Sequence, residues 1–97
     1  MPWNFPFWQV FRYAVPALMA GNTTILKHAP NVFGCAKAIE KAFPDSGFES
    51  GVFQAVICDV TATEAILADD RIAMVTLTGS ERAGASVAAL AGKHVKK

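Results

Sequence analysis

Charge is scarce in this sequence and nearly balanced. Charged residues make up 18% of the 97 residues, with nine lysines and arginines against eight aspartates and glutamates. The basic residues are scattered and form no stripe of the kind that binds a phosphate backbone. Three of them, Lys93, Lys96 and Lys97, are typical of a solvated C-terminal tail. We therefore expect no nucleic-acid partner.

Cysteine and histidine are also few, with two of each. Cys35 and Cys58 are too few for a disulfide scaffold and lack metal-ligand spacing, so a reducing cytoplasm is the expected compartment. His28 and His94 have no acidic cluster beside them, which argues against a metal site. The apolar stretch 14–21 is too short to span a bilayer, and no signal peptide is recognisable. We expect no membrane partner.

Apolar side chains, by contrast, are abundant. Hydrophobic residues make up 53% of the chain, and six of its ten aromatic residues fall within the first 13 positions. A small domain has a large surface to cover, so part of this apolar material is expected to face a partner or further chain. One interpretation is a non-catalytic, stand-alone module that self-associates through its aromatic N-terminal segment. The six aromatic residues are Trp3, Phe5, Phe7, Trp8, Phe11 and Tyr13.

The spacing of apolar residues predicts four helices and three strands in alternation. Helices are expected over 6–20, 30–43, 61–69 and 80–91, and strands over 23–27, 52–57 and 72–77. The strands are continuously apolar, which is typical of a parallel sheet covered on both faces. The predicted fold class is therefore α/β: a Rossmann-type parallel sheet with flanking helices, in a partial domain of about three strands and four helices.

Two segments lie where such a sheet binds ligands, beyond the carboxyl ends of its strands. After the first strand, Lys27 could pair with a phosphate or bond ribose hydroxyls, or simply be a solvated lysine. After the third strand, Gly79 and Ser80 open a helix whose free N–H groups could hold a phosphate. A serine N-cap with a glycine turn explains the same two residues.

Asn4 lies between two prolines in Pro2-Trp3-Asn4-Phe5-Pro6. Such a stiff frame could fix the side-chain amide in space, where its N–H could stabilise a developing oxyanion. An Asx-type turn or an N-cap is the alternative interpretation.

These segments together resemble the aldehyde dehydrogenase family over the whole chain, and most closely its succinate-semialdehyde dehydrogenase branch. The matching segments, in the family's order and approximate spacing, are Pro2-Trp3-Asn4-Phe5-Pro6, Pro16-Ala17-Leu18, Ala20-Gly21-Asn22, Leu26-Lys27 and Thr78-Gly79-Ser80. The resemblance implies that residues 1–97 are part of an NAD(P)-binding domain. The parent would oxidise an aldehyde, with succinate semialdehyde as the expected substrate, through a cysteine thiohemiacetal.

The resemblance also implies a role for each site residue. Asn4 would be catalytic, donating its amide to the thiohemiacetal oxyanion, and Trp3 would flank the nicotinamide together with it. The remaining implied cofactor contacts are Lys27, His28, Ala29 and Pro30 around the adenosine ribose, and Gly79 and Ser80 at the pyrophosphate.

Two departures from the family pattern matter. Many NAD-preferring members carry a glutamate where this chain has Pro30, so NADP is expected alongside NAD, with Lys27 available to a 2′-phosphate. The family's catalytic cysteine and glutamate have no counterpart here, since Cys35 and Cys58 match neither position nor context. We therefore expect the 97-residue chain alone to be inactive.

Overall fold

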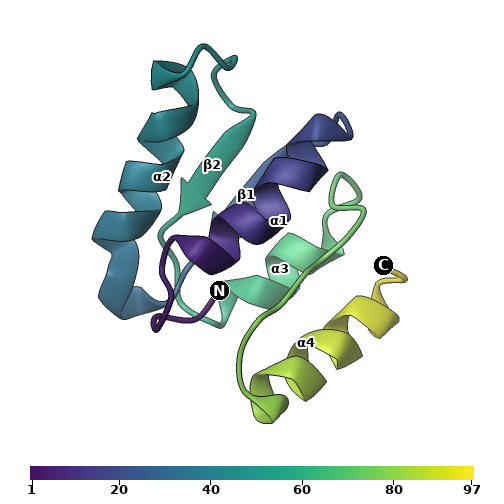
Figure 1. Cartoon of the computed structure of the whole chain (residues 1–97). Coiled ribbons are helices and arrows are strands. Elements are labelled where there is room, and N and C mark those ends of the chain that lie inside the picture. The colour runs from purple at the N-terminus through teal and green to yellow at the C-terminus, as the bar shows by residue number, and fades with distance from the viewer. The chain divides into compact units, whose positions relative to one another are not determined.

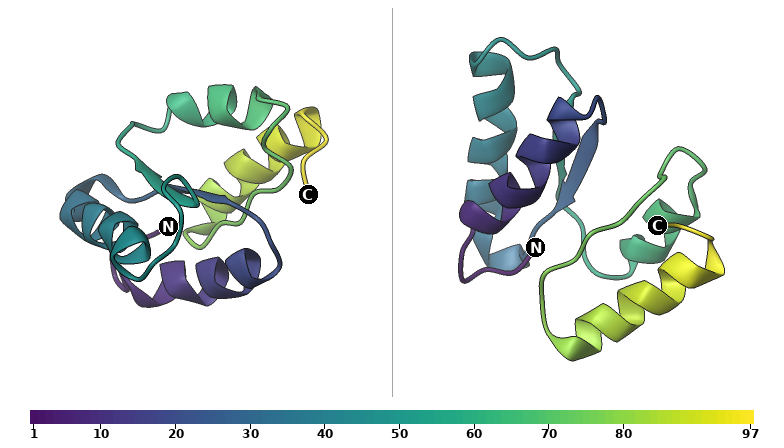
Figure 2. Two further views of the ribbon diagram at one scale, coloured as in Figure 1. Left: turned by 90° about the horizontal axis from the view of Figure 1, so that it is seen from above. Right: turned by 45° about the vertical axis from the view of Figure 1, so that its right-hand side comes forward.

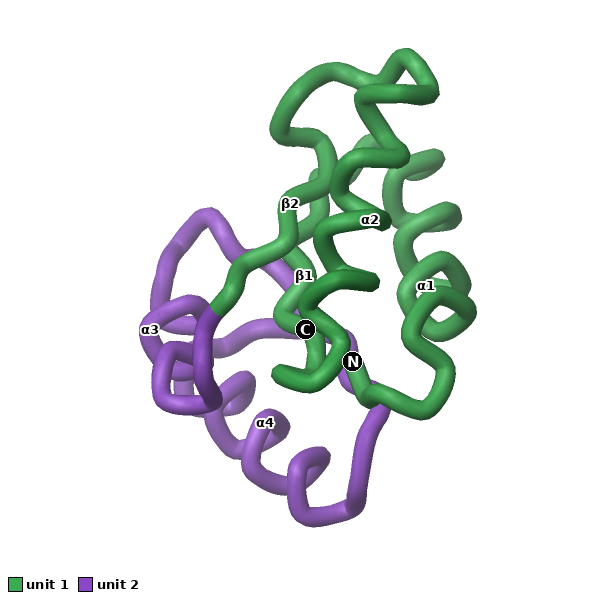
Figure 3. The backbone as a smooth tube through the Cα atoms, turned by 90° about the vertical axis from the view of Figure 1, so that its left-hand side faces the viewer, with its two compact units in different colours: residues 1–57 green, residues 58–97 purple.

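The computed structural model describes all 97 residues, which form two compact units, residues 1–57 and residues 58–97 (Figures 1 and 3). Unit 1 contains α1 (Trp8–Met19), β1 (Thr24–Lys27), the 3-10 helix η1 (Pro30–Val32), α2 (Phe33–Asp45) and β2 (Phe53–Val56). Unit 2 contains α3 (Ala62–Ala68) and α4 (Glu81–Lys93). None of these helices combines the length and the apolar composition that a membrane-spanning helix requires.

The sheet of unit 1 is a parallel pair, β1 and β2, joined by a crossover through α2. Burial alternates along both strands, and the buried side chains pack with residues of α1 and α2 in one cluster. Figure 2 shows the two helices on the same side of the strands. The α/β fold is confirmed, but within this unit only one face of the sheet is covered, since Ile25 on the other face is 46% exposed.

Helix α1 ends as its sequence predicts. It continues through Pro16 and stops before Gly21, whose φ of 85° is the left-handed conformation that glycine adopts without strain. Asn22 N–H donates to the carbonyl of Ala17 at 3.1 Å, and Gly21 N–H donates to that of Leu18 at 2.9 Å. These are the two hydrogen bonds of a Schellman C-cap, and they direct the chain into β1.

The core of unit 1 is centred on α2. Ile39 and Ala36 are fully buried, and Phe43 stacks on Phe53 at 4.7 Å between ring centroids. Three apolar side chains at helical spacing, Ala36, Ile39 and Phe43, therefore form the buried face of α2. The buried cluster is Val10, Ala14, Leu26, Ala36, Ile39, Phe43, Phe53 and Ala55.

The outer edge of β2 is protected by a side chain of α2. The N–H of Ala55 points away from β1, and it donates to Glu40 Oε1 at 2.8 Å. Lys37 Nζ donates to the other oxygen, Oε2, at 2.5 Å. The hydrogen bond from Lys37, followed by that from Ala55, lowers the pKa of Glu40. Because the folded pKa is lowered, this stabilisation is present above the unfolded pKa and is lost as pH falls through the folded value.

Replacing Glu40 by alanine is expected to destabilise the chain by about 1–3 kcal/mol at neutral pH, because the N–H of the buried Ala55 loses its acceptor. Lys37→Ala is the matched control, since it removes only an exposed i,i+3 pair and should cost about 0–1 kcal/mol. Urea unfolding followed by circular dichroism measures both. Equal effects of the two substitutions would contradict the edge-protecting role of Glu40.

The third predicted strand, residues 72–77, is not a strand in the structure. Within unit 2 its backbone forms isolated hydrogen bonds and no ladder: Ile72 N–H donates to the carbonyl of Asp69 at 3.0 Å, Val75 N–H donates to that of Lys97 at 2.9 Å, and Lys97 N–H donates to that of Ala73 at 3.3 Å. A strand requires hydrogen-bonded neighbours along its length, which apolar side chains cannot replace. The sheet therefore has two strands rather than three.

The helices of unit 2 begin in two different ways. Ser80 precedes α4 in an extended conformation, and its Oγ accepts from Ala83 N–H at 3.2 Å. Thr61 precedes α3 but already has helical dihedrals, so its hydroxyl cannot cap and donates instead to Asp59 Oδ1. Glu64, which the Thr61 spacing would place in a capping box, instead pairs with a lysine of α4 at 2.5 Å.

Candidate functional site

The N-terminal segment of unit 1 lies at the carboxyl end of β1. The amino group of Met1 donates to the carbonyl of Lys27 at 3.0 Å, and Ala29 N–H donates to the carbonyl of Met1 at 3.1 Å. This is the hydrogen-bond pattern of a parallel strand pair. The segment that follows, residues 2–6, is therefore held at the edge of the sheet where parallel α/β folds bind ligands.

His28 makes the second attachment. Its imidazole is 1% exposed, with Nε2 at 2.8 Å from the carbonyl oxygen of Pro6 and Nδ1 at 3.0 Å from Ala29 N. The buried ring has no free surface for a ribose, so only the backbone of His28 remains available for the cofactor contact predicted from the resemblance. The burial of His28 could have been predicted from the alternation of β1. Every second residue of this strand faces inward, and His28 follows Thr24 and Leu26 in that series.

Between these two attachments the site residues face outward. Trp3 is 63% exposed, and Asn4 is exposed with a side-chain amide that bonds to no other part of the chain. An Asx-turn or N-cap would occupy the amide oxygen of Asn4 with a backbone N–H, so that alternative is not observed. The amide N–H groups of Asn4 are free to donate to a bound molecule.

Lys27 is the last residue of β1 and is half-buried. Its Nζ donates to the carbonyl of His28 at 3.4 Å and forms no ion pair with a carboxylate. Ala29 is half-buried, and the exposed Pro30 begins η1. Unit 1 thus brings Trp3, Asn4 and the segment 27–30 to one end of its sheet, with an unpaired ammonium group among them.

Gly79 and Ser80 lie in unit 2, at the N-terminus of α4. The N-cap interpretation of Ser80 is confirmed, and it leaves the hydroxyl hydrogen able to donate, because only the oxygen accepts from Ala83. No group of three or more His, Cys, Asp or Glu side chains is placed to hold a metal.

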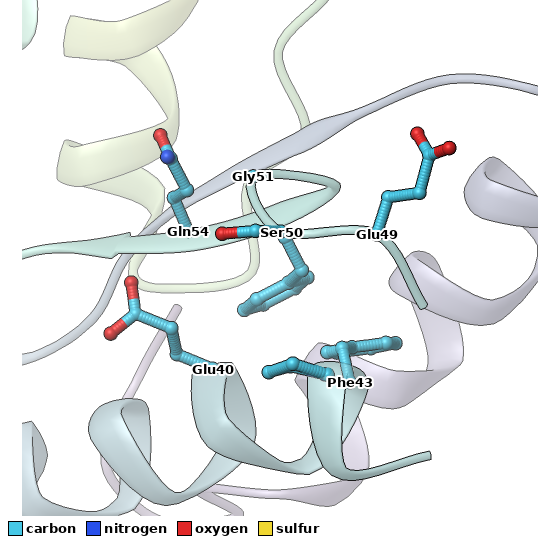
Figure 4. A pocket seen from close by; sticks show the side chains of 8 residues that line it. Glu40, Phe43, Glu49, Ser50, Gly51 and Gln54 are labelled. Atoms are coloured by element: carbon cyan, nitrogen blue, oxygen red, sulfur yellow. The ribbon is translucent and has the colours of Figure 1, made fainter. Parts of the chain in front are cut away.

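A hollow of about 130 Å³ lies elsewhere in unit 1, between α2 and the turn that enters β2 (Figure 4). Glu40 and Phe43 line it from the helix, and Glu49, Ser50 and Gln54 line it from the turn and strand. Phe53, which also lines the hollow, is the first residue of β2, so the hollow lies at the amino end of the strand. This is the end opposite to Lys27, where a parallel sheet does not bind its ligands.

Sequence comparison supports a single family. The profile of the aldehyde dehydrogenase family matches residues 1–97. The chain is 57% identical over 97 residues to a probable succinate-semialdehyde dehydrogenase [NADP(+)] of Synechocystis sp., and 53% identical to the succinate semialdehyde dehydrogenase [NAD(P)+] Sad of Escherichia coli. In both comparisons the whole chain is covered, and it spans 21% of the relative's length.

Solved structures give the same result. The chain is similar to Gox0499, from a study of cofactor and substrate selection, with a TM-score of 0.97 and 52% identity. It is also similar to succinic semialdehyde dehydrogenase from Streptococcus pyogenes in complex with NADP+, with a TM-score of 0.97 and 40% identity. Each similarity covers 99% of this chain and 21% of the other. The chain carries a free asparagine amide and a lysine without an ion-pair partner at one end of a parallel sheet, and it belongs to the aldehyde dehydrogenase family.

Proposed function

We propose that residues 1–97 are part of the NAD(P)-binding domain of an enzyme that oxidises an aldehyde to the acid, and that Asn4 is a catalytic residue of that enzyme. The observation that carries this proposal is the exposed Asn4 amide, which has no internal partner on a loop attached twice to the end of β1. Attack of a cysteine thiolate on an aldehyde turns the carbonyl oxygen into an oxyanion. A fixed amide N–H stabilises that charge as it develops.

Each unit, taken by itself, presents one group that suits part of a phosphate-bearing dinucleotide. Lys27 presents an ammonium group without a carboxylate partner, and Ser80 presents a hydroxyl hydrogen at the N-terminus of a 13-residue helix. Ammonium groups and helix N-termini both attract phosphate oxygens. We therefore propose that the ribose side of the cofactor meets Lys27, with Ala29, Pro30 and the backbone of His28 around it, and that Gly79 and Ser80 meet the pyrophosphate. When bound, the cofactor accepts the hydride that leaves the thiohemiacetal.

We further propose that the cofactor is NAD or NADP. Two residues of the chain, Lys27 and Pro30, are compatible with the 2′-phosphate of NADP. Pro30 places no carboxylate near Lys27, so a 2′-phosphate would meet a cation and no like charge. The relatives from Synechocystis and Escherichia coli are named for NADP(+) and NAD(P)+, and the Streptococcus pyogenes structure is a complex with NADP+. The same names support succinate semialdehyde as the substrate.

A chimeric enzyme tests the function directly. In the Escherichia coli relative, the matched segment is replaced by this 97-residue chain, and turnover of succinate semialdehyde is measured with NADP+ and with NAD+. We expect turnover with both cofactors. The isolated chain is expected to show none, because it offers no matching cysteine nucleophile or glutamate base. A folded but inactive chimera, or an active isolated chain, would contradict the proposal.

Ser80 offers a way to separate stability from cofactor binding. Ser80→Ala is expected to destabilise unit 2 by about 1 kcal/mol, because Ala83 N–H loses its cap. Ser80→Asp keeps an acceptor for that N–H but places a negative charge where the pyrophosphate is proposed to lie. We expect Ser80→Asp to retain the thermal stability of the chimera while raising KM for NADP+ more than Ser80→Ala does. An unchanged KM for NADP+ in both variants would show that Ser80 does not contact the cofactor.

We also propose that the isolated chain self-associates through its aromatic N-terminal segment. Four side chains of that segment are 46–64% exposed: Trp3, Phe5, Phe7 and Trp8. Adjacent exposed aromatic side chains favour association because burying them removes apolar area from water. Sedimentation velocity at several concentrations is expected to show a concentration-dependent rise in apparent mass, which Trp8→Ser should reduce. A monomer at all concentrations would contradict this proposal.

A further inference from the structure

We propose that His28 is a positioning residue for Asn4: its buried imidazole fixes the far end of the asparagine loop through the carbonyl oxygen of Pro6. This inference rests on the proposed function, because it assigns His28 a role only if Asn4 stabilises an oxyanion. The observation that carries it is the 2.8 Å contact between His28 Nε2 and Pro6 O, made by a ring that is 1% exposed.

The partners of the ring determine where its proton lies. A carbonyl oxygen only accepts hydrogen bonds, so Nε2, which faces Pro6 O, carries the hydrogen and donates it. Nδ1 lies 3.0 Å from Ala29 N, whose N–H only donates, and 3.2 Å from the carbonyl oxygen of Met1, which only accepts. The contact of Nε2 with Pro6 O is the shorter of the two carbonyl contacts, so we assign the single proton to Nε2, and Nδ1 then accepts from Ala29 N–H. The neutral imidazole with its proton on Nε2 satisfies the contacts with Pro6 and Ala29, while the carbonyl oxygen of Met1 accepts from Ala29 N–H at 3.1 Å.

The loop has few other attachments. At one end Met1 pairs with Lys27 and Ala29, and at the other end Pro6 accepts from His28. Between them Trp3, Asn4 and Phe5 are exposed, and the backbone bond from Gln9 N to Phe5 O is long, at 3.5 Å. Met1 packs against the core cluster, but the exposed residues 3–5 depend on the two hydrogen-bonded ends of the loop.

The position of Asn4 therefore depends on His28. Pro6 follows Asn4 by two residues, and its ring fixes φ, so little freedom lies between the tethered carbonyl and the amide. Loss of the Nε2–H···O bond leaves the Pro6 carbonyl without its buried donor and frees this end of the loop. A displacement of a catalytic group by about 1 Å can lower the rate about 100-fold.

Two amide substitutions separate the two ring contacts in the chimeric enzyme described above. The amide nitrogen of glutamine reaches about as far along the side chain as Nε2, so His28→Gln can still donate to Pro6 O. The shorter asparagine matches Nδ1, so His28→Asn can accept from Ala29 N–H but cannot reach Pro6. We expect His28→Asn to lower kcat about 10- to 100-fold with KM for NADP+ little changed, and His28→Gln to recover most of that loss.

A double substitution tests whether the effect passes through Asn4. In the Asn4→Ala background there is no amide to position, so adding His28→Asn should change kcat by less than about twofold. Should His28→Asn cost the same in both backgrounds, or His28→Gln fail like His28→Asn, the positioning role is wrong. If Asn4→Ala itself leaves kcat unchanged, the proposed function fails first, and the two failures are distinguished.

A measurement without substitution covers the case in which the His28 variants do not fold. Nitrogen-15 NMR of the imidazole in the unsubstituted 97-residue chain should show a protonated Nε2 and an unprotonated Nδ1, with the Nε2 proton slow to exchange. A ring with its single proton on Nδ1, or a freely exchanging ring, would show that His28 does not hold the Pro6 carbonyl. Either result would overturn the proposal.

Discussion

Replacing Asn4 by alanine is expected to lower kcat of the chimeric enzyme about 100- to 1000-fold, which corresponds to about 2.7–4 kcal/mol of transition-state stabilisation. The expected loss is large because the amide of Asn4 has no internal partner, so its N–H groups are available to donate to the substrate oxygen. It should fall on kcat rather than on KM, because the donor acts on charge that develops only as the thiohemiacetal forms.

Steady-state kinetics with succinate semialdehyde and NADP+ measures this effect, and Asn22→Ala is its control. Asn22 is also an exposed asparagine, but its side chain donates to Ala17 at the end of α1, before β1 begins. Asn22→Ala is expected to leave kcat unchanged. Full turnover after Asn4→Ala would remove the asparagine from the catalytic site, whatever family the chain belongs to.

The sequence predicted the elements that depend on local patterns. The apolar positions Ala36, Ile39 and Phe43 recur at helical spacing and face the core, and Gly21 ends α1 in the left-handed conformation that a C-cap requires. Ser80 caps α4, as is expected of a serine that directly precedes a helix. Each of these features is decided within a few residues of the chain.

Features that depend on distant partners were predicted less well. Residues 72–77 have the composition of a buried strand, but composition cannot supply the neighbouring backbone that a strand needs. The hydrogen bond between His28 and the Pro6 carbonyl could not be predicted, because the two residues are 22 positions apart in sequence. Had the alternation of β1 been extended past Lys27, it would have placed His28 on the buried face.

Ile39 is the largest of the fully buried side chains, so the stability of the core should depend strongly on it. Ile39 is fully buried in the cluster beneath the sheet, so Ile39→Ala is expected to destabilise the chain by about 2–5 kcal/mol through lost burial and the cavity left behind. Ile25→Ala is the matched control. It removes the same atoms from a side chain that is 46% exposed on the open face of β1, and should cost about 1 kcal/mol or less.

Urea unfolding of the isolated chain, followed by circular dichroism and by tryptophan fluorescence, measures the effect of Ile39→Ala against that of Ile25→Ala. A unit of this size is expected to have a stability of only a few kcal/mol, so Ile39→Ala should shift the midpoint strongly or abolish the transition. Equal midpoints for the two variants would contradict the one-sided core. A large effect at Ile39 alone would also show what supports the candidate site. The cluster that contains Ile39 packs against β1, and Lys27 and His28 lie at the carboxyl end of that strand.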